Sequence, residues 1–284
     1  MPVLETLRRL RHGPLSRFDR IWVSLGRLAR FVIAALPRST VKQRIGPFGP
    51  FRLDAYFAFS NFSAWGQGHN NGFLATVEAC RGKNCIFDIG GHIGLVTLPM
   101  SRVVSPAGRV FSFEPGKANL EFLRFHLARN NATNVEVVDT LVGDSDGWMD
   151  FFEQSGAAGQ NSVVLKKNQE AYQRVRRRQV TLDRFCADSE LRPEVIKVDV
   201  EGAELAVLRG ARETLRRNRP TLFLSVHPTE LRLLGESVDS LMHEIEDLGY
   251  VCLEIGGEPV AAFRLAEYLM LPKEQASGPA KQRD

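Results

Sequence analysis

The sequence predicts an α/β fold, a doubly wound parallel sheet with helices on both faces. Short apolar runs typical of buried strands alternate with longer segments whose apolar residues recur every three or four positions, as in helices. Several of these runs end in a carboxylate, which places acidic groups at the carboxyl edge of a parallel sheet. The first of these acid-terminated runs also continues into a glycine-rich turn, so this edge is where we expect a ligand.

The elements follow from these patterns in chain order. The expected strands span residues 84–88, 109–113, 135–139, 195–199 and 221–227, with a later one near 250–255. The clearest expected helices span residues 93–103, 117–130, 203–216 and 238–248. Between residues 140 and 183, four glycines interrupt short runs, which predicts a hairpin excursion that leads to an exposed loop.

The chain as a whole suits one domain. Its 284 residues, 44% of them hydrophobic, suffice for one ample core, which we place at residues 46–272. Residues 273–284 are expected to form a flexible tail. Residues 1–45 hold ten of the basic residues and only two acids, and helically spaced leucines predict a basic amphipathic helical extension. That extension either caps the domain or a partner subunit, or makes peripheral contact with a membrane surface.

Cysteines and apolar runs bear on the compartment. The four cysteines show no C-x-x-C spacing, so we expect reduced core residues and no metal bound by them. The first apolar run, residues 31–36, is too short to span a bilayer. The sequence therefore predicts a cytoplasmic protein, with the inner membrane surface as the alternative place.

The segment Cys85–Gly94 carries the strongest signal. An apolar strand ends at Asp88, and Gly90 and Gly94 let the backbone approach a ligand closely. The spacing Asp-x-Gly-x-x-x-Gly departs from the dinucleotide fingerprint G-x-G-x-x-G, which argues against NAD. A carboxylate before the turn suits S-adenosylmethionine, whose amino group and sulfonium are cationic and which has no pyrophosphate.

Further acids follow the next strands. Glu114 ends the run 109–113, twenty residues past Gly94, where doubly wound folds place an acid on ribose hydroxyls. Asp199 and Glu201 follow the run that begins at Val195. Two or more acids at neighbouring strand ends indicate one site.

Four motifs in this order resemble one known family. The series FDIGGHIG, VFSFEP, VTLDRF and IKVDVEGAE, the last followed by VLRGA, resembles the FkbM family of S-adenosylmethionine-dependent methyltransferases over about residues 74 to 256. The resemblance implies a class I methyltransferase sheet, which is Rossmann-like. It also implies O-methylation of a hydroxyl on a sugar, a glycan or glycolipid, or a related small metabolite.

The resemblance also implies roles for single residues. Asp88, Gly90 and Gly94 correspond to the methionine-side loop, Glu114 to the ribose ligand, and Asp199 with Glu201 to the acidic edge of the reaction site. The full expected cofactor set is Asp88, Gly90, Gly91, His92, Gly94, Glu114 and Asp144. Two departures stand out: Gly91-His92 replaces the more usual alanine and asparagine, and Ser225 replaces a glutamate that many relatives carry.

Methyl transfer to a neutral hydroxyl needs a proton acceptor. The candidates are His227, at the end of the strand 221–227, and Asp199 or Glu201 at the neighbouring strand end. The structural alternatives are a histidine bonded to backbone and an aspartate that caps a helix. Mg²⁺ held by Asp199, Glu201 and Glu204 also stays open, although the sequence assigns no metal site.

Acceptor and partners are less defined by the sequence. The stretch Trp65–Phe73 either floors an acceptor site with aromatic and amide groups or is a packed connector. The stretch Ser155–Ser162 suits a mobile cover or an ordinary loop. We expect a small-molecule or glycan acceptor and no nucleic acid, because basic clusters lack interleaved aromatics. The alternatives are an NAD- or sugar-nucleotide-dependent Rossmann enzyme and a nucleic-acid-binding methyltransferase-like protein; oligomeric state stays open.

Overall fold

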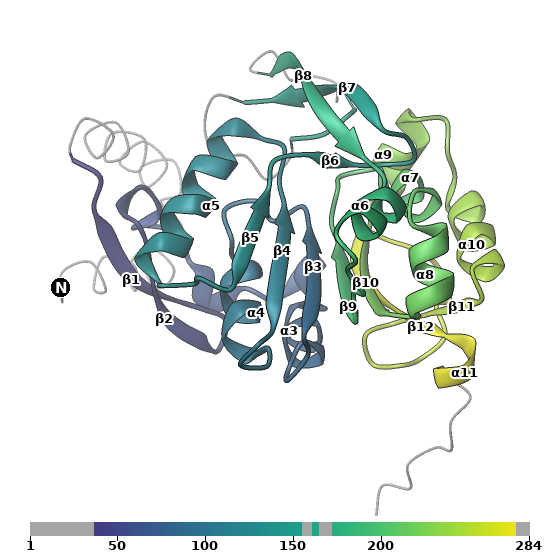
Figure 1. Ribbon diagram of the computed structural model, residues 1–284, viewed down its shortest axis with the longest axis horizontal. Helices are drawn as coiled ribbons and strands as arrows, with labels where there is room; N and C mark the ends of the chain where they lie inside the picture. Colours follow the sequence, from purple (N-terminus) through teal and green to yellow (C-terminus); the bar gives the residue numbers. More distant parts are fainter. Residues whose placement is uncertain (1–36, 155–160, 165–171, 277–284) are drawn as a thin grey trace, which may run out of the picture.

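The computed structural model describes residues 37–154, 161–164 and 172–276 and is built around a seven-stranded sheet (Figure 1). The strand order is β11-β12-β10-β9-β3-β4-β5. All pairs from β10 to β5 are parallel, which confirms the predicted doubly wound sheet. The strands are β3 (Cys85–Ile89), β4 (Arg109–Phe113), β5 (Val135–Val138), β9 (Val195–Val198), β10 (Thr221–Val226), β11 (Tyr250–Leu253) and β12 (Ala266–Pro272).

Strand β12 was not predicted, and it lies antiparallel between β10 and β11. Its register places Glu267 opposite Ser225. Glu267 is only 2% exposed, and its carboxylate accepts a hydrogen bond from the backbone N–H of Gly72.

Helices cover both faces of the sheet. Successive side chains of a strand point to opposite faces, so they pack into two different hydrophobic cores. Ile86 packs with α3, α4 and α5, whereas the adjacent Phe87 packs with α6, α7, α8 and α10. The helices are α3 (Phe73–Ala79), α4 (Thr97–Val103), α5 (Lys117–Arg129), α6 (Leu182–Asp188), α7 (Glu204–Arg209), α8 (Arg212–Asn218), α9 (Pro228–Leu233), α10 (Val238–Asp247) and α11 (Lys273–Ala276).

Two predicted helices differ from the observed ones. The helix expected over 203–216 is interrupted at Gly210, where an added Cβ would lie 1.9 Å from the carbonyl oxygen of Gly143. This close backbone approach admits only glycine and separates α7 from α8. The helix expected from residue 93 begins at Thr97, because the preceding glycine turn occupies residues 90–96.

Near both ends of the chain, the described residues differ from the predicted boundaries. Thr40–Ile45, expected as helix, is the strand β1, paired antiparallel with β2 (Phe48–Asp54). Its alternating burial suits a strand, a period that the helical reading of residues 1–45 overlooked. Residues 273–276, expected in the flexible tail, form α11. The rest of the predicted extension and tail, residues 1–36 and 277–284, lies outside the described residues.

The region 140–183, where the sequence pattern is weak, forms a separate three-stranded sheet that contains the predicted hairpin. β7 (Gly147–Glu153) and β8 (Gln173–Val180) pair antiparallel, and β6 (Leu141–Val142) lies along β8. Most of the predicted cover, residues 155–160, is outside the described residues. Across the described ranges, no helix is both long and apolar enough to cross a membrane.

Candidate active site

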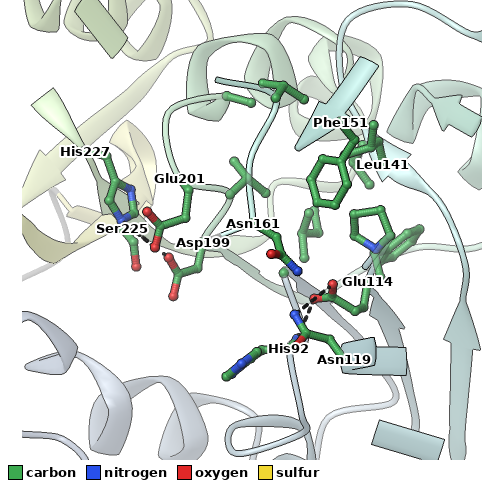
Figure 2. Close-up of a pocket in the computed structure, with 18 of the residues that line it drawn as sticks. His92, Glu114, Asn119, Leu141, Phe151, Asn161, Asp199, Glu201, Ser225 and His227 are labelled. Atoms are coloured by element: carbon green, nitrogen blue, oxygen red, sulfur yellow. Dashed lines mark hydrogen bonds and ion pairs between the residues drawn. The ribbon is translucent and has the colours of Figure 1, made fainter. Parts of the chain in front are cut away.

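A cavity opens where the central strands end, at the point where the chain winds outward from β3 in both directions (Figure 2). Ligands of doubly wound sheets bind at this switch point. Figure 2 shows His227, Glu201 and Asp199 at one end of the cavity and Glu114, Asn119 and His92 at the other. Side chains from β6 and β7 and the segment around Asn161 close the wall above Glu114.

The glycine turn after β3 joins the two ends. Gly90 has φ +91°, and an added Cβ would lie 2.0 Å from the carbonyl oxygen of Asp199. The N–H groups of Gly90 and Gly91 both donate to the carbonyl of Phe113, each at 2.9 Å. The turn therefore packs directly on the ends of β9 and β4, and any side chain at Gly90 would push β9 away.

Glu114 is held by three donors of its own chain. The backbone N–H groups of His92 and Gly116 donate to its two oxygens at 2.8 Å each, and the Asn119 amide donates at 3.2 Å. Burial raises the pKa of Glu114 to about 7, against the lowering effect of these donors. A carboxylate fixed in this way at the cavity wall is suited to accept a hydrogen bond from a ligand hydroxyl.

Asp88, which the sequence predicts to touch the cofactor, does not line the cavity. Its side chain is fully buried; Oδ2 accepts a 2.6 Å hydrogen bond from the Thr97 hydroxyl, and Oδ1 lies 3.9 Å from Nζ of Lys197. Burial raises the pKa of Asp88, and Lys197 opposes that shift. Asp88 thus belongs to the support beneath the turn.

Three other predicted cofactor residues also lie outside the cavity lining. Gly91 is enclosed by Ser112, whose hydroxyl would meet an added Cβ at 2.0 Å. Gly94 has φ +90° and packs against Leu123. Asp144 is exposed and accepts a hydrogen bond from Ser145 instead. The two glycines shape the turn, whereas the side chain of Asp144 is exposed to solvent. Of the predicted cofactor set, Gly90, His92 and Glu114 line the cavity.

The predicted catalytic residues Asp199, Glu201 and His227 do come together, and we call them the acid–histidine cluster. Nε2 of His227 lies 3.8 Å from Oδ1 of Asp199 and 3.7 Å from Oε1 of Glu201. The left-handed backbone of Glu201, φ +54°, aims its side chain at this point. All three line the cavity.

Two buried groups outside the cavity orient this cluster. Glu204, 0% exposed, faces Nδ1 of His227 at 2.6 Å and not the cavity, which removes it from the predicted magnesium set. Nζ of Lys197 donates to Oδ2 of Asp199 at 3.2 Å. Burial lowers the pKa of His227, but the hydrogen bond to Glu204 and the nearby carboxylates outweigh it and raise this pKa to about 9.

Several lining residues were not predicted as site residues. Asn119, Asn161, Phe151 and Ser225 all face the cavity. Asn161 follows a gap of 47 residues after Glu114, and no local spacing links the two. Of the stretch Trp65–Phe73, Trp65 and Asn70 line the cavity while Phe73 is buried in the core, so the stretch contributes to both.

The lining fits S-adenosylmethionine. Leu141, Val142 and Phe151 form an apolar wall suited to a flat base, next to Glu114 for ribose hydroxyls. Nδ2 of Asn161 and Nε2 of His92 are buried without a hydrogen-bond partner among the described residues, so polar groups remain there for a ligand. The acidic end suits the cationic methionine portion.

Comparisons with known proteins give the family. The model of the methyltransferase FkbM domain matches residues 88–252, more than half of the chain. The chain is 29% identical to Methyltransferase 1 of Beauveria bassiana in an alignment 144 residues long that covers 44% of this chain and 57% of that protein. It is also 29% identical to Methyltransferase sdnD of Sordaria araneosa in an alignment 157 residues long that covers 45% of this chain and 60% of that protein.

One solved structure is similar in outline. The FkbM methyltransferase of Methylobacillus flagellatus has 21% sequence identity and a TM-score of 0.44, over 67% of this chain and 44% of that one. The chain spans a little over half the length of the curated relatives it matches. The family match and the cavity at the switch point together place this chain in the FkbM family of S-adenosylmethionine-dependent methyltransferases.

Proposed function

We propose that the protein transfers a methyl group from S-adenosylmethionine to a hydroxyl of a sugar, glycan or related small metabolite. The observation that carries the proposal is a single cavity with a hydrogen-bonded carboxylate, Glu114, at one end and the acid–histidine cluster at the other. One end suits a nucleoside and the other suits a proton-releasing acceptor.

The cofactor's place follows from the chemistry of the lining. Glu114 would accept from the ribose hydroxyls, and the apolar wall of Leu141 and Phe151 would hold the adenine. The methionine portion would then extend past Gly90 toward Asp199, whose backbone oxygen packs on that glycine. Its reactive end would meet the acid–histidine cluster.

The acceptor's place is the mouth of the cavity beyond the cluster. Trp65, Asn70, Ser225 and Leu265 also line the cavity, and Leu265 is 52% exposed. An aromatic face, an amide and a hydroxyl are groups that bind sugar rings and their hydroxyls. These side chains favour a small polyhydroxylated acceptor.

The reaction needs alignment and the loss of one proton. When bound, S-adenosylmethionine supplies a sulfonium methyl group: the acceptor oxygen takes the methyl, the sulfur keeps the electron pair of the broken bond, and the hydroxyl releases a proton. We assign the departure of that proton to the acid–histidine cluster, with Asp199 nearest the cofactor turn.

Two measurements test the proposal. Isothermal titration of the full chain should show binding of S-adenosylhomocysteine, loss of that binding in Glu114→Ala, and no heat with NAD. Binding of NAD without S-adenosylhomocysteine would instead indicate an oxidoreductase.

The second measurement is methyl transfer to a panel of sugars and glycolipids, followed by mass spectrometry. Asp199→Asn should lower turnover by about 100-fold or more while the affinity for S-adenosylhomocysteine changes little. The matched control is Asp188→Asn, at a carboxylate whose side chain is 64% exposed. Equal turnover in Asp199→Asn and Asp188→Asn would remove Asp199 from the mechanism.

A further inference from the structure

The acid–histidine cluster has the composition and spacing of a metal-binding site. One ligand atom each from Asp199, Glu201 and His227 lies within 4.8 Å of the other two. Atoms bound to a common ion at about 2.1 Å lie roughly 3.0 to 3.4 Å from one another, so the 3.8 and 3.7 Å distances from Nε2 of His227 to Asp199 and Glu201 would have to shorten by a few tenths of an ångström around an ion. The observed 3.7 and 3.8 Å separations from Nε2 are too long for hydrogen bonds.

A second observation points to a metal ion independently of this spacing. Imidazoles that bind metals almost always pair their other nitrogen with a carboxylate or carbonyl, which fixes the ring. Here Nδ1 of His227 faces the buried Glu204 at 2.6 Å, and Glu204 is itself held by the N–H of Gly202 at 3.0 Å. Nε2 is thereby directed at the two carboxylates.

The carboxylate of Asp199 is fixed in a similar manner. Lys197 holds Oδ2 at 3.2 Å, so Oδ1 is the oxygen turned toward His227. The carbonyl of Glu201 accepts a hydrogen bond from the Ser162 hydroxyl at 2.8 Å, which anchors the backbone from which that side chain extends. Each potential ligand is positioned by a group that would not itself touch the ion.

We infer that Asp199, Glu201 and His227 bind a divalent first-row transition metal ion, with Mn²⁺ preferred over Mg²⁺. One imidazole with two carboxylates is a mixed nitrogen and oxygen set, whereas Mg²⁺ favours oxygen ligands and retained waters. Three protein ligands leave coordination positions facing the cavity. The set differs from the magnesium set considered from sequence, because His227 replaces Glu204.

The ion would deepen the proposed function, on which its catalytic use rests. At an open position it would hold the acceptor hydroxyl oxygen and weaken the O–H bond, so that the proton leaves to water before the methyl arrives. The carboxylates would then act as ligands and not as the proton's final acceptors.

The test is a titration of the full chain with MnCl₂ alone, in which the electron paramagnetic resonance signal measures the free Mn²⁺. We expect one ion per chain and at least tenfold weaker binding in His227→Gln and in Glu201→Gln. Glu204→Gln should weaken binding about tenfold by releasing the ring. Mg²⁺ should displace Mn²⁺ only at a concentration at least tenfold higher.

The matched control is His243→Gln. Nε2 of His243 lies 3.6 Å from Asp247 on the exposed face of α10. The substitution therefore removes a histidine beside an acid without changing the cavity. Unchanged Mn²⁺ binding in this variant is expected. If the wild-type chain shows no stoichiometric binding, or if His227→Gln and Glu201→Gln bind as tightly as His243→Gln, the metal site is wrong and the carboxylates only hold a proton on His227.

A parallel titration with S-adenosylhomocysteine in the presence of a chelator separates this inference from the proposed function. Cofactor binding together with full methyl transfer in chelator would overturn the catalytic use of the ion and leave the methyltransferase intact. Loss of Mn²⁺ binding in the cluster variants, with circular dichroism like that of the wild-type chain, would support the metal independently of any acceptor.

Discussion

The two ends of the cavity hold their carboxylates in opposite ways. Glu114 is surrounded by neutral donors, two backbone N–H groups and the amide of Asn119. Asp199 and Glu201 instead face charged or ionisable groups, Lys197 and His227. The first arrangement stabilises one carboxylate in place for a neutral ligand hydroxyl, and the second gathers negative charge that attracts a cation. Position is decided by hydrogen bonds at one end and by charge at the other.

The largest effect is expected at the glycine that joins the two ends. Gly90→Ala should lower the free energy of unfolding by about 3 kcal/mol or more, because the new Cβ meets the Asp199 carbonyl at 2.0 Å and φ is +91°. Urea denaturation measures this. Gly82→Ala is the control, since its φ is +69° but no atom lies within 4 Å of its added Cβ. Equal losses in both variants would show that backbone strain alone, and not the contact, matters.

The next effect distinguishes the buried acid from the cavity acid. Asp88→Ala should cost about 3 kcal/mol of stability, because Lys197 stays buried with one counter-charge fewer and Thr97 loses its acceptor. Affinity for S-adenosylhomocysteine should stay nearly unchanged in the folded fraction. Asp139→Ala, at an acid whose side chain is 50% exposed, is the matched control. Wild-type stability with lost binding would place Asp88 on the cofactor after all.

A smaller effect is expected from pH at the Glu114 end. With a pKa of about 7, Glu114 is ionised at about pH 8 and mostly protonated at about pH 6, so affinity for S-adenosylhomocysteine should fall about tenfold over that range. The other charged group that acts on Glu114 is Asp88, which raises the pKa of Glu114. His92 is neutral over this pH range because burial lowers its pKa to about 4. Glu114→Gln should bind more weakly at pH 8 and show no such pH dependence; a slope retained in that variant would assign the titration elsewhere.

The raised pKa of Glu114 also makes the stability of the folded chain depend on pH. The pKa of Glu114 is higher in the folded chain than the ordinary 4.5, so the folded state binds more protons between these values. Its contribution to folding is therefore greatest below about pH 4.5 and is lost as pH rises to about 7. Glu114→Gln should be the more stable chain at pH 8 in the absence of ligand, as thermal unfolding would show.

The smallest effect concerns one donor. Asn119→Ala removes the amide at 3.2 Å from Glu114 and should weaken S-adenosylhomocysteine binding by about 1 kcal/mol, roughly fivefold. Asn130→Ala is a suitable control, because its amide bonds the backbone of Arg52 and His126 far from the cavity. A loss as large as that of Glu114→Gln would mean that Asn119 contacts the ligand directly.

Local patterns predicted the parallel strands because each is a short, mostly apolar run that lies between helical segments. The residues at their ends, such as Glu114, Asp199 and His227, could be placed at one edge for the same reason. The local pattern did not show how deeply each of these side chains is buried. In the sequence, Asp88 and Glu114 look alike, since each is an acid at the end of a strand. In the structure, Asp88 pairs with Lys197 beneath the turn, whereas Glu114 lines the cavity.

The sequence by itself determined the parallel strands, the glycine turn and the family, since periodicity and motif spacing are local properties of the chain. Only the tertiary structure decided that Glu204 faces the back of His227, that Asn161 reaches the Glu114 end, and that β12 brings Glu267 beside Ser225. Each of these contacts joins segments 20 to 50 residues apart, and such meetings are set by how the layers pack and not by any local pattern.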